Sequence, residues 1–241
     1  MNTDIKDKLA AEFTAANFFE KIPAELHGFT LKKILADNSK KILTDDGEKI
    51  LEDGDKFIYF TYENISTHRS FTAYFHAETM EYKAWVKIGL TEFCLTNFFT
   101  DNFERFIQNL NAEMSDALKN LAEPADAESD ILIADKKFSA WSYGQSLPQS
   151  IGDFELFITP KNPVKITNGS YIIINYGNFE KNCDFSIVYN VYKDNFSGES
   201  QVGGVNHPSY IFDAKDLKML EIILQQNLEK TLNNLNSSVI S

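Results

Sequence analysis

Hydrophobic and polar residues alternate along much of this chain, and in three longer stretches the hydrophobic residues recur every three or four positions. Alternation is typical of half-buried strands, and the longer spacing is typical of amphipathic helices. The pattern predicts helices at 4–20, 100–121 and 213–235, the second capped by Thr100-Asp101-Asn102. It predicts strands at 56–62, 71–78, 82–90, 131–134, 138–143, 154–159, 171–176 and 185–192, with a shorter one near 201–205.

The order of predicted elements occurs twice. A shift of 114 residues places 57–121 on 171–235 without a gap, and the apolar positions coincide through strands, turns and helix. The sequence therefore predicts an α+β fold of two tandem antiparallel β-meander-plus-C-terminal-helix repeats, related by internal duplication, with an extra N-terminal helix. The alternative is that any two segments of strands followed by a helix align somewhere. The chain before Phe57 does not align without a gap, so the predicted repeat begins there.

A break in this pattern divides the chain. Residues 122–130 contain a proline and four carboxylates and continue neither the helix before them nor the strands after them. We therefore expect three parts: the N-terminal helix with the first repeat at 1–121, an acidic linker at 122–130, and the second repeat at 131–241.

The predicted strands at 71–78 and 82–90 each have an apolar face and a mixed face. The mixed face carries Thr72, Tyr74, His76 and Glu78 on the first strand and Lys83, Trp85 and Lys87 on the second. Opposed residues of antiparallel strands share a face, so the two apolar faces coincide if the turn is Met80-Glu81 or another loop of even length. The turn at Met80-Glu81 places Glu78 opposite Lys83, His76 opposite Trp85 and Tyr74 opposite Lys87. The shift of 114 residues places the corresponding turn at Asp194-Asn195.

A tryptophan on a mixed face is the most distinctive feature of this pattern. If the helix covers the apolar face, the other face presents a candidate binding surface of Tyr74, His76, Trp85 and Lys87. The alternative is that another element, such as the helix at 4–20, the other half or a second protomer, covers these residues.

Composition and charge exclude several classes of protein. The 241 residues carry a formal net charge of -12, which argues against nucleic-acid binding because phosphates require clustered Lys and Arg. The N-terminus lacks the pattern of a signal peptide, and no apolar run is long enough to cross a bilayer. We therefore expect a cytoplasmic protein in which Cys94 and Cys183 are reduced, structural thiols.

The chain contains no recognisable catalytic or cofactor motif. Its four histidines lack the spacing of metal ligands, and no phosphate-binding loop or nucleophile elbow occurs. The glycine-rich stretch 198–204 is typical of a bulge or tight strand end. The nearest approach to a catalytic cluster is His76 with Tyr74 and Glu78, but residues two apart on a strand lie about 6.5–7 Å apart. The sequence predicts no cofactor, no metal site and no catalytic residue, and it favours a non-enzyme over an enzyme.

These observations favour a non-catalytic cytoplasmic protein-interaction or scaffold protein. Its partner is then another protein or a second copy of the chain, with no nucleic acid and no membrane involved. The alternative is a binding protein that holds a small apolar ligand between helix and sheet, because 20 Phe, 10 Tyr and 2 Trp permit an aromatic cavity.

Overall fold

The structure is a computed structural model that describes residues 9, 11–12, 15–33, 52–53, 56–166 and 169–238. Their contacts divide the chain into two compact units. Met1–Lys87 and Glu92–Glu123 form the first unit, and Ile88–Thr91 and Pro124–Ser241 form the second. The predicted ranges 1–121, 122–130 and 131–241 remain predictions as domain boundaries.

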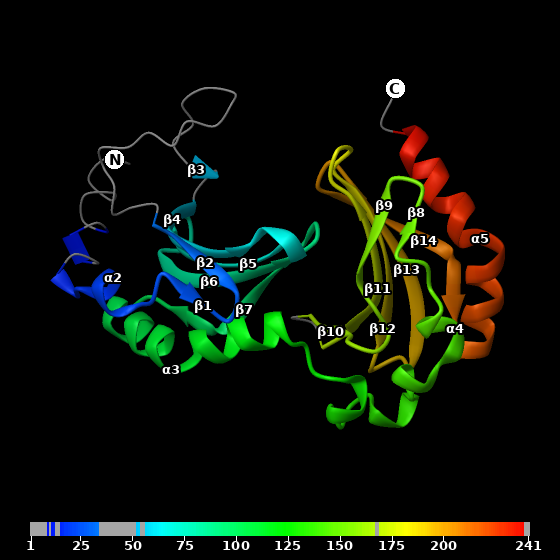
Figure 1. Cartoon of the computed structure of the whole chain (residues 1–241), viewed down its shortest axis with the longest axis horizontal. Coiled ribbons are helices and arrows are strands. Elements are labelled where there is room, and N and C mark those ends of the chain that lie inside the picture. Colours follow the sequence, from blue (N-terminus) through cyan, green and yellow to red (C-terminus); the bar gives the residue numbers. More distant parts are fainter. Residues whose placement is uncertain are drawn as a thin grey trace. The chain divides into compact units, whose positions relative to one another are not determined.

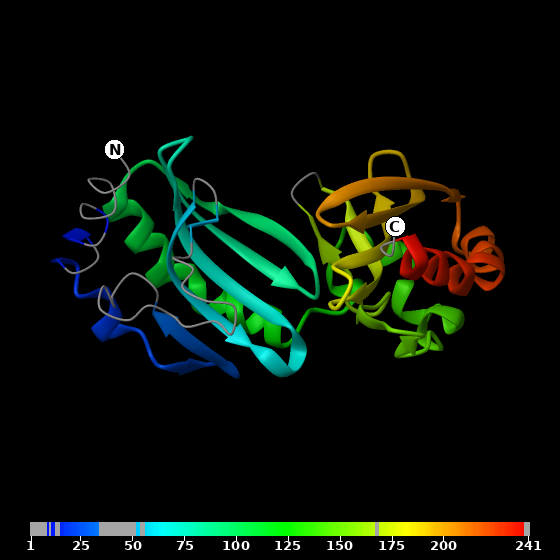
Figure 2. The same ribbon diagram turned by 90° about the horizontal axis from the view of Figure 1, so that it is seen from above.

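The first unit is a sheet with one long helix on one face (Figures 1 and 2). Its strands follow the order β1-β2-β4-β5-β6-β7, with β3 paired to β4. The helix α3 begins after Asn102, whose side chain accepts a hydrogen bond from the amide of Arg105, so the predicted cap is confirmed. The elements are α2 (Phe18–Lys21), β1 (Glu25–Leu26), β2 (Phe29–Lys33), β3 (Glu52–Asp53), β4 (Lys56–Asn64), η1 (Ile65–Thr67), β5 (Arg69–His76), β6 (Glu81–Ile88), β7 (Thr91–Thr100) and α3 (Phe103–Ala122).

The second unit repeats this plan. Its sheet order is β14-β13-β12-β11-β9-β8, with β10 paired to β11, and α5 lies on one face of the sheet (Figure 1). The elements are η2 (Ala127–Ser129), η3 (Ala134–Lys136), η4 (Phe138–Ala140), α4 (Ser142–Gln145), β8 (Ser150–Ile151), β9 (Phe154–Ile158), β10 (Val164–Lys165), β11 (Tyr171–Asn178), β12 (Cys183–Asn190), β13 (Asn195–Val202), β14 (Val205–Ala214) and α5 (Leu217–Ser238). The molecule is therefore α+β with two antiparallel sheets and a C-terminal helix.

The core of each unit lies between its long helix and its sheet. In the first unit the ring of Phe106 packs 5.4 Å from Tyr82 and 6.4 Å from Tyr59, measured between centroids. In the second unit a row of leucines on α5 is buried against the sheet: Leu220, Leu224, Leu228 and Leu232. The three- or four-residue spacing of these side chains places them on one helix face, as the sequence pattern predicts.

The two sheets correspond strand by strand. Adding 114 to the bounds of β5, β6 and β7 reproduces the bounds of β12, β13 and β14. Phe57 pairs with Phe75 in the first sheet, and Tyr171 pairs with Tyr189 in the second. In both sheets the register then shifts at the next position, between Ile58 and Phe60 and between Ile172 and Ile174.

The correspondence extends to the segment before β4, with an offset of 125 residues. Here β1 and β2 correspond to β8 and β9, and each hairpin pairs with the following long strand at the same positions. Glu63 pairs with Thr30, and Gly177 pairs with Glu155. A change of offset from 125 to 114 residues explains why a gapless alignment stops near Phe57.

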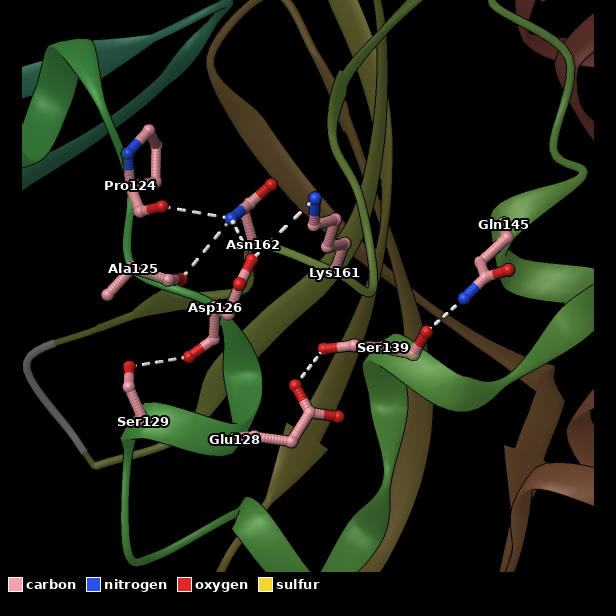
Figure 3. Close-up of polar contacts among 9 residues, drawn as sticks. All are labelled: Pro124, Ala125, Asp126, Glu128, Ser129, Ser139, Gln145, Lys161 and Asn162. Carbon is pink, nitrogen blue, oxygen red and sulfur yellow. Dashed lines mark hydrogen bonds and ion pairs between the residues drawn. The ribbon is translucent and has the colours of Figure 1, made fainter.

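Polar contacts hold the segment that begins the second unit, from Pro124 onward, as Figure 3 shows. The Asn162 amide nitrogen donates to the carbonyl of Pro124 at 2.9 Å and to the Asp126 carboxylate at 3.3 Å. The backbone amide of Ala127 donates to the carbonyl of Lys161 at 2.9 Å. Ala127 is buried in the core of the second unit, so this part of the predicted linker packs as folded structure.

Several predicted elements are wrong. The segments predicted as strands at 131–134 and 138–143 lie in turns and in the short helices η3, η4 and α4. Apolar residues of these segments, such as Ile133 and Phe138, are buried in the core of the second unit. Their spacing in the sequence resembles that of a short buried strand. The edge strands β7 and β14 were not predicted as full strands.

The N-terminal helix predicted at 4–20 is not confirmed as one continuous helix. Described residues 9, 11–12 and 15 are helical and α2 follows them, but Asn17 directly before α2 has φ 47°, outside the right-handed helical region. The rest of that prediction, and the turns predicted at 37–38 and 46–47, lie outside the described residues. No described helix has the length and apolar character needed to span a membrane.

Candidate binding surface

Tyr74 and Trp85 lie against each other on the sheet face opposite α3. Their ring centroids are 4.3 Å apart, with an interplanar angle of 56°. Tyr74 on β5 is buried, whereas Trp85 on β6 is half-buried. Residues of one strand face share a direction, which brings these two rings from neighbouring strands together.

Lys56 lies beside this aromatic pair. Its ammonium nitrogen lies 4.9 Å from the centroid of the Trp85 ring, within the range of a cation–π interaction. Simple alternation from Phe60 would place Lys56 on the α3 side of the sheet. The register shift in β4 reverses that assignment, because Ile58 pairs with Tyr74 and Lys56 pairs with His76. The hydrophobic pattern does not indicate Lys56, because a bulge cannot be recognised reliably from the spacing of apolar residues.

Tyr74 is held as a neutral phenol. Burial raises the pKa of Tyr74, and a contact of its hydroxyl oxygen with Cys94 Sγ at 3.5 Å acts in the same direction. Cys94 and Cys183 are both free thiols. The arrangement positions the Tyr74 ring as a support for Trp85.

His76 and Lys87 occupy the edge of this surface. The Thr79 amide donates to His76 Nδ1 at 3.3 Å, and the His76 ring lies 6.4 Å from the Tyr74 ring. Lys87 forms an ion pair with Glu92 at 3.3 Å. The structure thus brings together Tyr74, His76 and Trp85 of the predicted set, while the cation at the Trp85 ring is Lys56.

The predicted register of this hairpin is wrong. β5 ends at His76 and β6 begins at Glu81, so the turn spans 77–80, and Glu78 lies in the turn. Glu78 therefore does not lie opposite Lys83 as predicted. Lys83 instead forms an ion pair with Glu81 at 2.8 Å. The four-residue turn has the even length that the alternative required. Met80 at the end of the turn has φ 54°, a left-handed conformation that the sequence did not indicate.

The corresponding hairpin in the second unit shows the same turn length. Asn190 pairs with Asn195, so the turn spans 191–194 and the predicted turn at Asp194-Asn195 is wrong. Asp194 ends this turn with φ 49°, as Met80 does in the first unit.

The second unit has different residues at the positions of the candidate surface. Val188 corresponds to Tyr74, Asn190 to His76, Glu199 to Trp85 and Gln201 to Lys87, while Ser170 stands where the first unit has Lys56. The same strand positions therefore carry an aromatic and basic cluster in one unit and none of its members in the other.

A small apolar ligand held between helix and sheet stays a prediction. One hollow at the surface of the first unit, of about 610 Å³, is lined by Glu12, Ala15, Ala16, Asn102, Phe103 and Glu104. Tyr82 donates its hydroxyl hydrogen to Glu12 at 2.7 Å beside this hollow. Its two carboxylates and open shape do not suit an apolar ligand.

A buried polar group in the second unit was also missed by the sequence analysis. The Asn175 amide nitrogen donates to Asp184 at 3.2 Å and to Ser186 at 2.9 Å. Burial raises the pKa of Asp184, and the hydrogen bond from Asn175 opposes that shift. Polar residues inside the apolar runs of β11 and β12 were the available signal. Among the described residues, no group of three or more His, Cys, Asp or Glu side chains could hold a metal ion.

Comparisons of the chain with protein-family models, with curated proteins and with solved structures gave no match.

Proposed function

We propose that this chain is a non-catalytic cytoplasmic protein that binds a protein partner through the Trp85 face, defined as Lys56, Tyr74, His76 and Trp85. The observation that carries the proposal is the comparison of the two units. Glu199 occupies the position of Trp85 in a strand with matching bounds, so this fold does not require a tryptophan there. A side chain that the fold does not need is available for binding.

The geometry of the face suits protein recognition. Interfaces draw most of their binding energy from a few tryptophan, tyrosine and arginine side chains held in place before binding. The Trp85 ring lies against both the Tyr74 ring and the Lys56 ammonium group, and Trp85 is half-buried. A partner therefore loses little conformational entropy from the Trp85 side chain when it packs an apolar group on this ring.

We also propose that the two units arose by internal duplication. The matching strand bounds, the shared register shift and the second offset of 125 residues all support this origin. Independent folds would need to arrive at the same register irregularity by chance. After duplication, the two copies of one surface were free to diverge, and the Trp85 face belongs to the first copy alone.

Crosslinking in cells that naturally express the protein tests the binding proposal. A photo-crosslinking residue in place of Lys87, beside Trp85, is expected to give an adduct with a second protein. The Trp85→Glu variant, which introduces the second unit's residue, is expected to lose that adduct and to keep its unfolding midpoint. A crosslinker in place of the exposed Tyr192 serves as the control.

Two outcomes contradict the proposal. Adducts that survive Trp85→Glu would show that the face does not bind the partner. Unfolding of the Trp85→Glu and Trp85→Phe chains alike would show that Trp85 serves the core of the first unit.

A further inference from the structure

Exposed apolar side chains occur on two adjoining elements of the second unit, β14 and the first turns of α5. Tyr210 and Ile211 on β14 are 75% and 54% exposed, and Met219 and Ile222 on α5 are 46% and 56% exposed. Single exposed apolar residues are ordinary, but a group on two adjoining elements is typical of an interaction site. β14 and α5 adjoin in the structure, as Figure 1 shows.

The first unit provides an internal comparison for this patch. At the corresponding positions it carries Thr96, Asn97, Arg105 and Gln108, all polar and all exposed. The burial pattern of α5 from 217 to 228 is the same as that of α3 from 103 to 114. The change from polar to apolar therefore affects the outer surface alone, and the packing of the helix does not require it.

Ile211 and Ile223 occupy positions where the strand and the helix meet in the first unit. In the first unit the Asn109 amide donates to the carbonyl of Asn97 at 2.9 Å, which places these two positions in contact. The second unit has Ile223 and Ile211 there, so a polar boundary is replaced by an apolar one. We call Tyr210, Ile211, Met219 and Ile222, together with the outer edge of Ile223, the β14–α5 patch.

β14 is also the last strand of its sheet. It pairs with β13 on one side, at 205–209 and at Ala214 with a register shift between them, and the sheet order ends there. The outer edge of such a strand presents backbone donors and acceptors that can pair with another strand. An antiparallel copy of the same strand is self-complementary, and a two-fold axis then also brings the two copies of α5 together.

We propose that the β14–α5 patch is the interface of a homodimer, in which β14 and α5 of one chain pack antiparallel to β14 and α5 of a second copy. This surface is distinct from the Trp85 face, and the proposal does not rest on the proposed function. The dimer carries two copies of the Trp85 face.

Charge favours a second copy as the occupant. The exposed α5 positions between Lys218 and Glu229 are uncharged, being Met219, Ile222, Gln225 and Gln226. Two chains of net charge -12 repel each other least where they meet at an uncharged surface.

The two ends of the exposed stretch of α5 carry opposite charges. Lys218 stands before its uncharged positions and Glu229 after them, so in an antiparallel pair of α5 helices Lys218 of each copy lies toward the end that carries Glu229 of the other. The 22 residues of α5 span about 33 Å, and with a ten-residue edge strand this length suits an interface of about 800 Å² per partner.

Sedimentation velocity of the purified full chain tests the proposal. We expect a species of twice the 27.5 kDa chain mass that dissociates on dilution. The variant with Tyr210→Thr, Ile211→Asn, Met219→Arg and Ile222→Gln carries the first unit's residues and is expected to be monomeric with an unchanged unfolding midpoint. If the variant with four substitutions unfolds, the single change Ile222→Gln takes its place. It is expected to raise the dissociation constant of the dimer about tenfold. Ile131→Asn, at a residue 91% exposed outside the patch, is the control and is expected to dimerise normally.

A crosslink tests the two-fold arrangement. In a chain with Cys94→Ser, Ile222→Cys is expected to form an intermolecular disulfide, because Ile222 lies near the axis. Gln108→Cys, at the corresponding position of α3, is expected to stay monomeric on a non-reducing gel. A monomer at every soluble concentration, or dimerisation that the Ile222 variants leave unchanged, overturns the proposal. Trp85→Glu is expected to remain dimeric, so failure of one proposal is distinguishable from failure of the other.

Discussion

Tyr62 and Tyr176 occupy corresponding positions in the two sheets, and each donates its hydroxyl hydrogen to the carbonyl oxygen of a proline. Tyr62 binds Pro23 at 2.6 Å, and Tyr176 binds Pro148 at 2.7 Å. Burial raises the pKa of Tyr62 to about 12 and that of Tyr176 further, so both phenols keep the proton they donate. The two bonds tie the chain before each first hairpin to the central strand of its sheet.

Replacing either tyrosine with phenylalanine is expected to destabilise its own unit. The change removes one hydrogen bond and leaves a proline carbonyl without its donor, at a cost of about 1 kcal/mol in the free energy of unfolding. Tyr62→Phe and Tyr176→Phe are to be compared by urea unfolding, with hydrogen exchange assigning the loss to a unit. An effect spread evenly over both units by either change would contradict the expectation.

Gly198→Ala is expected to destabilise the second unit by about 1–3 kcal/mol through overpacking. An added Cβ would lie 2.8 Å from the Cβ of Phe212 and 3.0 Å from the Ser209 carbonyl oxygen. The corresponding residue of the first unit, Ala84, is accommodated beside Phe98. Urea unfolding measures the loss, with Ser197→Ala as the neighbouring control. An unchanged free energy of unfolding would mean that β14 moves away without cost.

Asn162→Ala is expected to loosen the start of the second unit. The change leaves the Pro124 carbonyl and the Asp126 carboxylate without their shared donor, which costs about 1–2 kcal/mol. Faster limited proteolysis within 122–130 measures the effect. Lys161→Ala is the matched control, because its contact with Asp126 is a 3.9 Å pair between exposed side chains and is expected to contribute little. Equal cleavage in both variants would refute the role of Asn162.

Asp130→Asn is expected to remove part of the pH dependence of stability. Burial opposes ionisation of Asp130, but hydrogen bonds from Tyr171 at 2.6 Å and from the Leu132 amide lower its pKa below the ordinary 3.8. A lowered pKa in the folded state stabilises the fold above the ordinary value, and this contribution is lost as the pH falls through the folded value.

Unfolding of both proteins at neutral pH and near pH 3 measures the difference. The wild-type chain is expected to be the more stable at neutral pH, and the gap is expected to narrow in acid. A gap that stays constant with pH would show that the Asp130 charge has no part in stability. Tyr171→Phe removes the hydrogen-bond donor and keeps the carboxylate. In this background, the loss of stability that Asp130→Asn causes at neutral pH is expected to be smaller.

The strands with clear alternation were predictable, and the candidate surface was predictable in part. Tyr74, His76 and Trp85 lie together because period-two alternation alone places them on one face. Lys56 joins them only because of the register shift in β4, and Lys87 turns to Glu92. A bulge and a left-handed turn residue such as Met80 depend on backbone geometry that many sequences can adopt.

The sequence by itself determined the α+β class, the two helix-covered sheets and the offset of 114 residues, because the spacing of apolar residues records which face of each element is buried. Only the tertiary structure decided that 131–143 forms turns and short helices, that Tyr62 and Tyr176 bind equivalent prolines, and that four apolar residues of β14 and α5 are exposed. These features join residues distant in sequence, and local periodicity carries no information about such contacts.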